Sequence, residues 1–175
     1  TMSHNEVKYR ARLVKDFGQI PPVLGSEGKL SQVFLNLIIN AAHAIGEGKV
    51  EQNRITVRTW AEGPDVFAEV ADSGPGIAPE LLERIFEPFF TTKGVGVGSG
   101  LGLSISRKIL AEFGGDIHVE SELGKGARFV IRLPAHAASP EQRPGAAVSI
   151  TPPQPAVRGR ILVVDDEEMI RRTLQ

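Results

Sequence analysis

The sequence predicts an α/β fold, because strand patterns and helix patterns alternate along most of the chain. Apolar and polar residues alternate over 54–60, 117–121 and 127–133, as they do in half-buried strands. An apolar run over 66–71 predicts a further strand, and a shorter strand is expected at 12–17. Apolar residues recur at helical spacing over 27–44 and again after Leu101, where the expected apolar face comprises Ile105, Ile109, Leu110 and Phe113. Glycine-rich and proline-rich turns separate these segments, which favours one domain built from a sheet and helices.

Composition limits the function classes. The 175 residues are 41% hydrophobic, enough for one ordinary core, and the formal net charge of −1 offers no general attraction to nucleic acid or to an anionic membrane. There is no cysteine for disulfides or thiolate metal sites, and no apolar run reaches the roughly 18–20 residues of a membrane span. These features are compatible with a cytoplasmic domain that makes no nucleic-acid or direct membrane contacts. They leave open whether a longer parent protein is anchored in the inner membrane.

The segment 27–44 predicts a helix with an apolar face and one polar edge. Ser26 is placed to cap this helix, and Gly46 and Gly48 are placed to end it. The apolar face comprises Leu30, Val33, Phe34, Leu37, Ile38, Ala41 and Ile45, and the polar edge comprises Gln32, Asn36, Asn40 and His43. Amides on so apolar a helix need polar partners, and their oxygens suit Mg²⁺, for which Asn40 is the first candidate ligand. His43 is a candidate donor to a phosphate; the alternative is that these side chains cap neighbouring strands or face solvent.

A second informative stretch begins where the strand 66–71 ends, and we call residues 72–77 the acid turn. The Asp72 carboxylate is expected just beyond the strand, beside backbone that Gly74 and Gly76 leave open to close approach. Because an ionised carboxylate only accepts hydrogen bonds, it suits an amino group such as adenine N6.

Glycine is unusually dense further along. Gly94, Gly96, Gly98, Gly100 and Gly102 alternate with small or apolar residues, and Leu101-Gly102-Leu103-Ser104 then opens a helix. Successive backbone N–H groups in such a loop turn toward an anion, and the helix N-terminus adds a partial positive charge. The loop and the helix start together predict a triphosphate cradle.

The stretch between the acid turn and the glycines predicts a short helix and an aromatic cluster. A proline at the start and acids in the first turn favour a helix over 79–85. Phe86, Phe89 and Phe90 follow, and they either belong to the core or anchor a lid. We expect the most mobile part of that lid at 91–99, where glycine is densest.

The end of the chain predicts a linker and a second unit. From Pro134 to Val157 the composition changes to Ala, Pro, Ser and Gln, which is typical of a semi-rigid linker. Residues 160–167 then predict a buried strand that ends in acids, and 168–174 predict the start of a helix. One strand and a helix turn do not fold alone.

In order and spacing, these motifs resemble those of the catalytic and ATP-binding domain of bacterial sensor histidine kinases. Residues 32–41 (QVFLNLIINA) are similar to the family's N box, 72–77 (DSGPGI) to its G1 box, 85–90 (IFEPFF) to its F box and 98–103 (GSGLGL) to its G2 box. The resemblance covers about residues 5–135. It implies the GHKL ATPase fold, a two-layer α/β sandwich in which helices pack on one face of a mixed sheet.

The resemblance also implies which residues hold the cofactors, ATP and Mg²⁺. Asn40 would coordinate Mg²⁺, Asp72 would accept from adenine N6, and a lid from Phe89 to Gly100 would close over the phosphates. The implied nucleotide contacts are Asn36, Asn40, His43, Asp72, Gly74, Gly76, Ile77, Phe89, Phe90, Thr91, Thr92, Lys93, Gly98, Ser99, Gly100, Leu101, Gly102 and Leu103. Asn36, Asn40, His43 and Lys93 are the catalytic candidates. Ala127 stands where many relatives have a threonine in the adenine network, so we expect water to take that role.

The family's chemistry needs a second domain. Its phosphoacceptor histidine lies in a helical dimerisation domain, and none of His4, His43, His118 and His136 lies in the expected motif. We therefore expect a fragment that binds ATP but depends for phosphotransfer on that domain, which would make the parent protein a homodimer.

The last residues of the sequence resemble the beginning of a second domain. Residues 160–167 are similar to the first strand of a response-regulator receiver, in which Asp165 and Asp166 would help to hold Mg²⁺. This implies a hybrid kinase in a phosphorelay, with a receiver domain or response regulator as partner. The predicted divisions are 1–11 as the tail of the dimerisation region, 12–135 as the catalytic and ATP-binding domain, 136–157 as a linker and 158–175 as the truncated start of a receiver.

Two alternatives remain open. A GHKL ATPase related to topoisomerases, heat-shock chaperones or mismatch-repair proteins would use a glutamate base on the 27–44 helix, which offers Gln32, Asn36 and Asn40 instead. A non-catalytic nucleotide sensor would only change its contacts with a partner. A P-loop is excluded because no G-x-x-x-x-G-K-[ST] occurs, and a Rossmann site is disfavoured because the glycines do not directly follow a strand.

Overall fold

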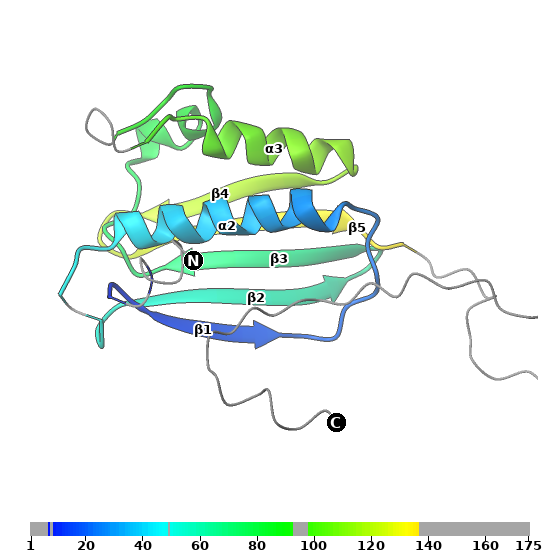
Figure 1. The fold of residues 1–175 in the computed structure, drawn as a ribbon, viewed down its shortest axis with the longest axis horizontal. Helices are drawn as coiled ribbons and strands as arrows, with labels where there is room; N and C mark the ends of the chain where they lie inside the picture. The colour runs from blue at the N-terminus through cyan, green and yellow to red at the C-terminus, as the bar shows by residue number, and fades with distance from the viewer. Residues whose placement is uncertain (1–6, 8, 49, 93–97, 137–175) are drawn as a thin grey trace, which may run out of the picture. The chain divides into compact units, whose positions relative to one another are not determined.

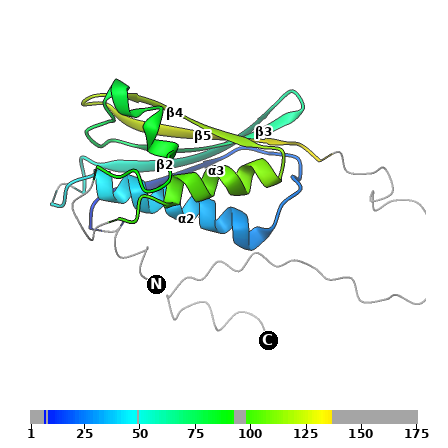
Figure 2. The same cartoon turned by 90° about the horizontal axis from the view of Figure 1, so that it is seen from above.

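The computed structural model of the chain describes residues 7, 9–48, 50–92 and 98–136, and in them two α-helices pack on one face of a five-stranded sheet (Figure 1; Figure 2). The strands are β1 (Arg12–Phe17), β2 (Arg54–Glu62), β3 (Asp65–Asp72), β4 (Asp116–Glu122) and β5 (Gly126–Pro134). The helices are α2 (Glu27–Ala44) and α3 (Gly102–Glu112), and two 3₁₀ turns, η1 (Pro79–Leu81) and η2 (Arg84–Phe86), lie between β3 and α3. The predicted two-layer α/β sandwich is confirmed.

The sheet is mixed, as predicted. Its strand order is β1-β2-β3-β5-β4, in which β1 runs parallel to β2 and every other neighbouring pair is antiparallel. β2 and β3 form an antiparallel hairpin in which Glu62 pairs with Asp65. Only Gly63 and Pro64 are left to turn the chain, and Gly63 does so with a φ of 57°.

The core lies between the helices and the sheet. From α2, Val33, Leu37 and Ala41 are buried against strand residues such as Ile55 and Val70. Fully burying a side chain such as Leu37 contributes roughly 1.5–3 kcal/mol to folding. The predicted apolar face of this helix is therefore confirmed, with Leu30, Phe34 and Ile38 packed partly buried at its border.

The buried face of α3 differs from the prediction by one position. Ile105 is 40% exposed, whereas Ser106 is only 1% exposed and faces α2. The predicted core role of Ile105 is therefore wrong, and the smaller Ser106 takes the position that faces α2. Ile109 and Leu110 are buried as expected, and Gly114 ends the helix with a φ of 71°.

The ends of α2 are held by backbone and by one arginine. Ser26 occupies the N-cap position, but its hydroxyl makes no cap hydrogen bond within the described part of the chain. At the other end, the Arg10 guanidinium donates to the carbonyls of Ala42 and Ile45, each over 3.4 Å, and pairs with Glu47 over 2.7 Å. The segment before β1 is thereby tied to the end of α2.

The predicted helix over 79–85 forms two 3₁₀ turns instead. Leu82 donates to the Pro79 carbonyl over 3.2 Å, and Glu87 donates to the Arg84 carbonyl over 2.9 Å. So short a segment gains too few i→i+4 bonds to offset the cost of starting an α-helix, and 3₁₀ turns need fewer residues.

The three phenylalanines that follow divide between core and surface. Phe86 and Phe90 pack against the core, and the guanidinium groups of Arg107 and Arg84 lie 5.5 Å and 4.6 Å from their ring centres. Phe89 is 74% exposed and has a φ of 66°, a conformation that non-glycine residues rarely adopt. The core role is thus confirmed for two of the three.

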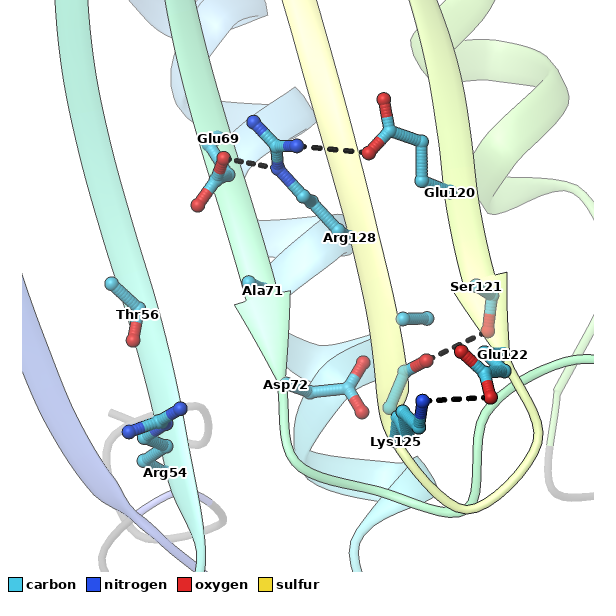
Figure 3. A pocket seen from close by; sticks show the side chains of 12 residues that line it. Arg54, Thr56, Glu69, Ala71, Asp72, Glu120, Ser121, Glu122, Lys125 and Arg128 are labelled. Carbon is cyan, nitrogen blue, oxygen red and sulfur yellow. Dashed lines mark hydrogen bonds and ion pairs between the residues drawn. The ribbon is translucent and has the colours of Figure 1, made fainter.

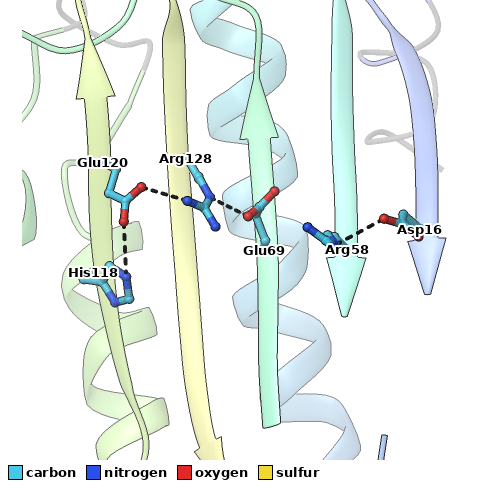
Figure 4. A network of polar contacts seen from close by, with 6 residues as sticks. All are labelled: Asp16, Arg58, Glu69, His118, Glu120 and Arg128. Carbon is cyan, nitrogen blue, oxygen red and sulfur yellow. Dashed lines mark hydrogen bonds and ion pairs between the residues drawn. The ribbon is translucent and has the colours of Figure 1, made fainter. Parts of the chain in front are cut away.

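The other face of the sheet carries a row of charges (Figure 4). Arg128 donates to Glu69 over 2.5 Å and to Glu120 over 2.8 Å, and Arg58 lies 3.2 Å from Asp16. The hydrogen bond to the Glu69 carboxylate raises the pKa of the Arg128 guanidinium. These paired charges keep a mostly polar surface over strands that are apolar on their helix side.

Several predictions fall outside the described residues. These include most of the segment 1–11, the linker and receiver start from residue 137 onward, and with them Asp165 and Asp166. The helices that the structure does describe include none long and apolar enough to cross a membrane.

Candidate functional site

The acid turn begins inside the sheet. Asp72 is the last residue of β3 and pairs with Ile55, so its carboxylate lies at the end of the strand. Its Oδ1 accepts the backbone N–H of Gly74 over 2.7 Å. Burial raises the pKa of Asp72, while hydrogen bonds from the backbone N–H groups of Gly74 and Ala127 oppose the rise. A partly buried carboxylate with acceptor capacity left is a suitable partner for an amino group.

Two contacts fix the beginning of the turn against β2 and α2. Ser73 donates its N–H to the Arg54 carbonyl over 3.1 Å, and its hydroxyl accepts the Arg54 N–H over 3.0 Å. A Cβ on Gly74 would lie 2.7 Å from the Asp72 Oδ1 and 3.4 Å from the Ala44 Cβ. Only glycine at this position leaves the carboxylate in place beside the end of α2.

The end of the turn is held by the loop between β4 and β5. The Gly124 N–H donates to the Pro75 carbonyl over 2.7 Å, and the Ile77 N–H donates to the Ser121 hydroxyl over 2.8 Å. Gly76 has a φ of 76°, and a Cβ there would collide with the Glu122 carbonyl. Both glycines that were predicted to permit close approach therefore do so.

The polar edge of α2 reaches the start of α3. The Asn36 amide donates to the Ser106 hydroxyl over 3.0 Å, and a Cβ on Gly102 would collide with the Asn36 carboxamide. Asn40 and His43 follow one and two turns later on the same helix, and both are partly buried. The structure thus brings the predicted amide edge and the predicted phosphate cradle to the same side of the sheet.

The described part of the glycine loop leads into α3. Gly100, with a φ of 67°, packs against the backbone of Phe89, and Leu101 donates to the Ser99 hydroxyl over 3.3 Å. The first turn of any α-helix leaves N–H groups without partners inside the helix, and here those groups start at Gly102. Of the remaining predicted contacts, Thr91, Thr92, Gly98 and Ser99 are exposed, whereas Lys93, Gly94 and Gly96 lie outside the described residues.

Two hollows lie near these residues. A groove of about 180 Å³ between α2 and α3 is lined by Gln32, Leu35, Asn36, Ile39, Gly102, Ile105 and Ser106. A broader hollow of about 520 Å³ lies over the strands at the β4–β5 turn (Figure 3), where its lining includes Arg54, Ala71, Asp72, Lys125 and Arg128. Cross-strand partners point to the same face, and Asp72 is paired with the buried Ile55. We therefore assign the candidate site to the helix side, where Asp72, Asn36 and Gly102 lie.

Sequence reasoning missed two serines. Ser121 continues the inward alternation of Ile117 and Val119, and Ser106 lies on the apolar stripe of α3 with Ile109. Each serine occupies a position where the strand or helix pattern calls for an apolar residue. This could have identified them, because a buried hydroxyl needs a hydrogen-bond partner. Each serine contacts a segment that the motifs had already identified.

Among the described residues, no cluster of three or more His, Asp or Glu side chains is arranged to hold a metal ion. Amide oxygens such as those on α2 are of a chemical type that can bind Mg²⁺ when the ion takes few protein ligands and completes its shell with water and phosphate oxygens.

Comparison with known proteins gives the same family throughout. The family model described as "Histidine kinase-, DNA gyrase B-, and HSP90-like ATPase" matches residues 25–137. Sensor kinase CckA of Brucella abortus is 36% identical over 171 residues, which cover 86% of this chain and 18% of that protein. Sensor histidine kinase ZraS of Salmonella typhi is 51% identical over 107 residues, 61% of this chain and 22% of that protein. The chain thus spans about a fifth of the length of these relatives.

Solved structures agree in fold. The nucleotide-free catalytic domain of histidine kinase ThkA matches 76% of this chain and 84% of its own length, with a TM-score of 0.64 and 35% identity. Full-length ShkA in complex with AMPPNP matches 79% of this chain and 29% of its own length, with a TM-score of 0.65 and 36% identity.

Proposed function

The chain belongs to the family of histidine kinase-, DNA gyrase B- and HSP90-like ATPases, and on this basis we propose that it is the ATP-binding catalytic domain of a two-component sensor histidine kinase. The similarity to sensor kinases such as CckA and ZraS supports the kinase branch of the family. The observation that carries the proposal is the meeting of the acid turn, the polar edge of α2 and the start of α3 on one side of the sheet.

Adenine is recognised by the acid turn. Asp72 accepts a hydrogen bond from the 6-amino group, and Gly74 and Gly76 let the acid turn pack closely against α2 and the β4–β5 turn, which keeps this carboxylate in place. The partly buried position of Asp72 strengthens that bond, because competition from water is reduced.

The phosphates lie between α2 and the start of α3. Asn40 would supply an amide oxygen to Mg²⁺. The bound ion would neutralise part of the phosphate charge. His43 and Lys93 donate to phosphate oxygens, and the N–H groups that begin at Gly102 face the same anion. ShkA, a solved structure with the same fold, is described in complex with AMPPNP, an ATP analogue.

The reaction is phosphoryl transfer to a histidine outside this domain. The imidazole nitrogen attacks the γ-phosphorus, the bond to the bridging oxygen breaks, and ADP leaves with the electron pair of that bond. The domain contributes position and electrostatic stabilisation and no covalent intermediate. The acceptor lies on a dimerisation domain of the same parent protein, a homodimer, and a receiver whose start is residues 158–175, with Asp165 and Asp166 as its paired acids, takes the phosphate on.

ATP hydrolysis with a glutamate base is the weaker alternative. The only acid in α2 is Glu27, which is exposed in its first turn, far along the helix from Asn40. A carboxylate general base must reach the attacking water within about one hydrogen bond. The α2 helix therefore offers none beside the proposed Mg²⁺ ligand.

The test is substitution of the proposed Mg²⁺ ligand. Asn40→Ala should remove the Mg²⁺ dependence of binding to an ATP analogue and lower phosphotransfer to an added dimerisation domain by about a hundredfold or more. Gln52→Ala, which removes an exposed amide outside the site, serves as the matched control and should change neither. Normal phosphotransfer by the Asn40→Ala protein would show that Asn40 is not the ligand.

A further inference from the structure

The acid turn and the β4–β5 turn are joined through one hydroxyl group. The Ser121 Oγ accepts the N–H of Ile77 over 2.8 Å and donates to the carbonyl of Gly126 over 2.7 Å. One side chain thus satisfies a donor and an acceptor from two different turns. The Gly124 N–H adds a second link between these turns, because it donates to the Pro75 carbonyl.

These contacts close a ring around Asp72. Gly126 has a φ of 89°, and its Cα lies so close to the Asp72 carbonyl that a Cβ would collide with it. The path therefore runs from Ile77 through Ser121 and Gly126 back to Asp72, the residue that would recognise adenine.

We propose that Ser121 is a positioning residue for base recognition, holding the acid turn so that Asp72 selects a purine with a 6-amino group. The inference rests on the proposed function. Ser121 acts through Ile77 and Gly126 and does not itself touch the nucleotide.

The position of Ser121 favours a hydroxyl for this purpose. Its side chain follows Ile117 and Val119 on the inward face of β4, where a purely apolar residue would fit the alternation. Without the hydroxyl, the Ile77 N–H and the Gly126 carbonyl would each lose a partner, and the Gly124–Pro75 hydrogen bond would hold the two turns together less firmly than both links do. Contacts to the triphosphate come from α2 and α3 and should not change.

The experiment compares threonine and valine at position 121, which have the same shape and differ only in the hydroxyl. Binding of ATP and of inosine triphosphate, which has an oxygen in place of the 6-amino group, is measured by titration calorimetry in the presence of Mg²⁺. Ser121→Thr should keep the wild-type preference for ATP within about twofold. Ser121→Val should bind ATP about tenfold more weakly, a loss of roughly 1.4 kcal/mol, with inosine triphosphate affinity unchanged within about twofold.

A control separates positioning from stability. Ile117→Val removes a buried methylene from the same strand without touching the acid turn, so it should lower Tm and leave the ATP preference intact. A Ser121→Val protein that melts lower but keeps the ATP preference of the wild type overturns the inference alone. A wild-type protein that binds both nucleotides equally overturns the adenine assignment and this inference together.

Discussion

The ionised Asp72 side chain is expected to destabilise the fold while it favours adenine binding, and both effects can be measured. Burial raises the pKa of Asp72, so the folded protein binds a proton there more readily than the unfolded chain. Above the unfolded pKa of about 4 the ionised group therefore opposes folding, and this penalty grows as the pH rises through the folded pKa. Asp72→Asn should raise Tm at pH 7.5, and the gain should vanish below about pH 4, where both states are protonated.

The same substitution should weaken ATP binding by about tenfold or more. The amide of Asp72→Asn can still accept the Gly74 N–H, but its NH₂ group then faces the 6-amino group, donor against donor. Thermal melts at the two pH values and calorimetric titration with an ATP analogue measure both effects. A protein that is destabilised equally at both pH values would contradict the burial argument.

At the scale of elements, the β4–β5 turn distinguishes two left-handed glycines. Gly124 has a φ of 82°, and a Cβ added there would meet no atom within 4 Å, whereas a Cβ on Gly126 would collide with the Asp72 carbonyl. Gly124→Ala should therefore lower the free energy of unfolding by only roughly 1–2 kcal/mol, the cost of a left-handed conformation for alanine. Gly126→Ala should lower it by at least about 3 kcal/mol. Denaturant unfolding measures both, and equal losses would show that the two turns are not interlocked.

The elements also show what sequence patterns can predict. The bounds of β1 and α2 agree with the prediction, because alternation and helical spacing are local properties. The contact of Ile77 with Ser121 spans 44 positions and that of Asn36 with Ser106 spans 70, so neither follows from a local pattern. They depend on strand register and helix packing.

Over the whole molecule, the motifs predicted which segments form the site but not how they are held. The acid turn was identified from Asp72 and its glycines, yet its support by Ser73, Ser121 and Gly126 required the three-dimensional arrangement. Ile105 was misplaced because apolar spacing alone cannot show that Ser106 is buried and hydrogen-bonded to Asn36 of α2 while Ile105 is exposed. Local chemistry was thus predictable, and long-range packing was not.

The central claim is that the nucleotide lies on the helix side of the sheet and not in the broader hollow opposite. Backbone amide chemical shifts, measured with and without an ATP analogue and Mg²⁺, test this most directly. We predict that the largest changes occur at Gly74, Ile77, Asn40 and Gly102, with the amides of Thr56 and Val130 nearly unchanged. Changes concentrated at Thr56 and Val130, on the uncovered face, would contradict the account.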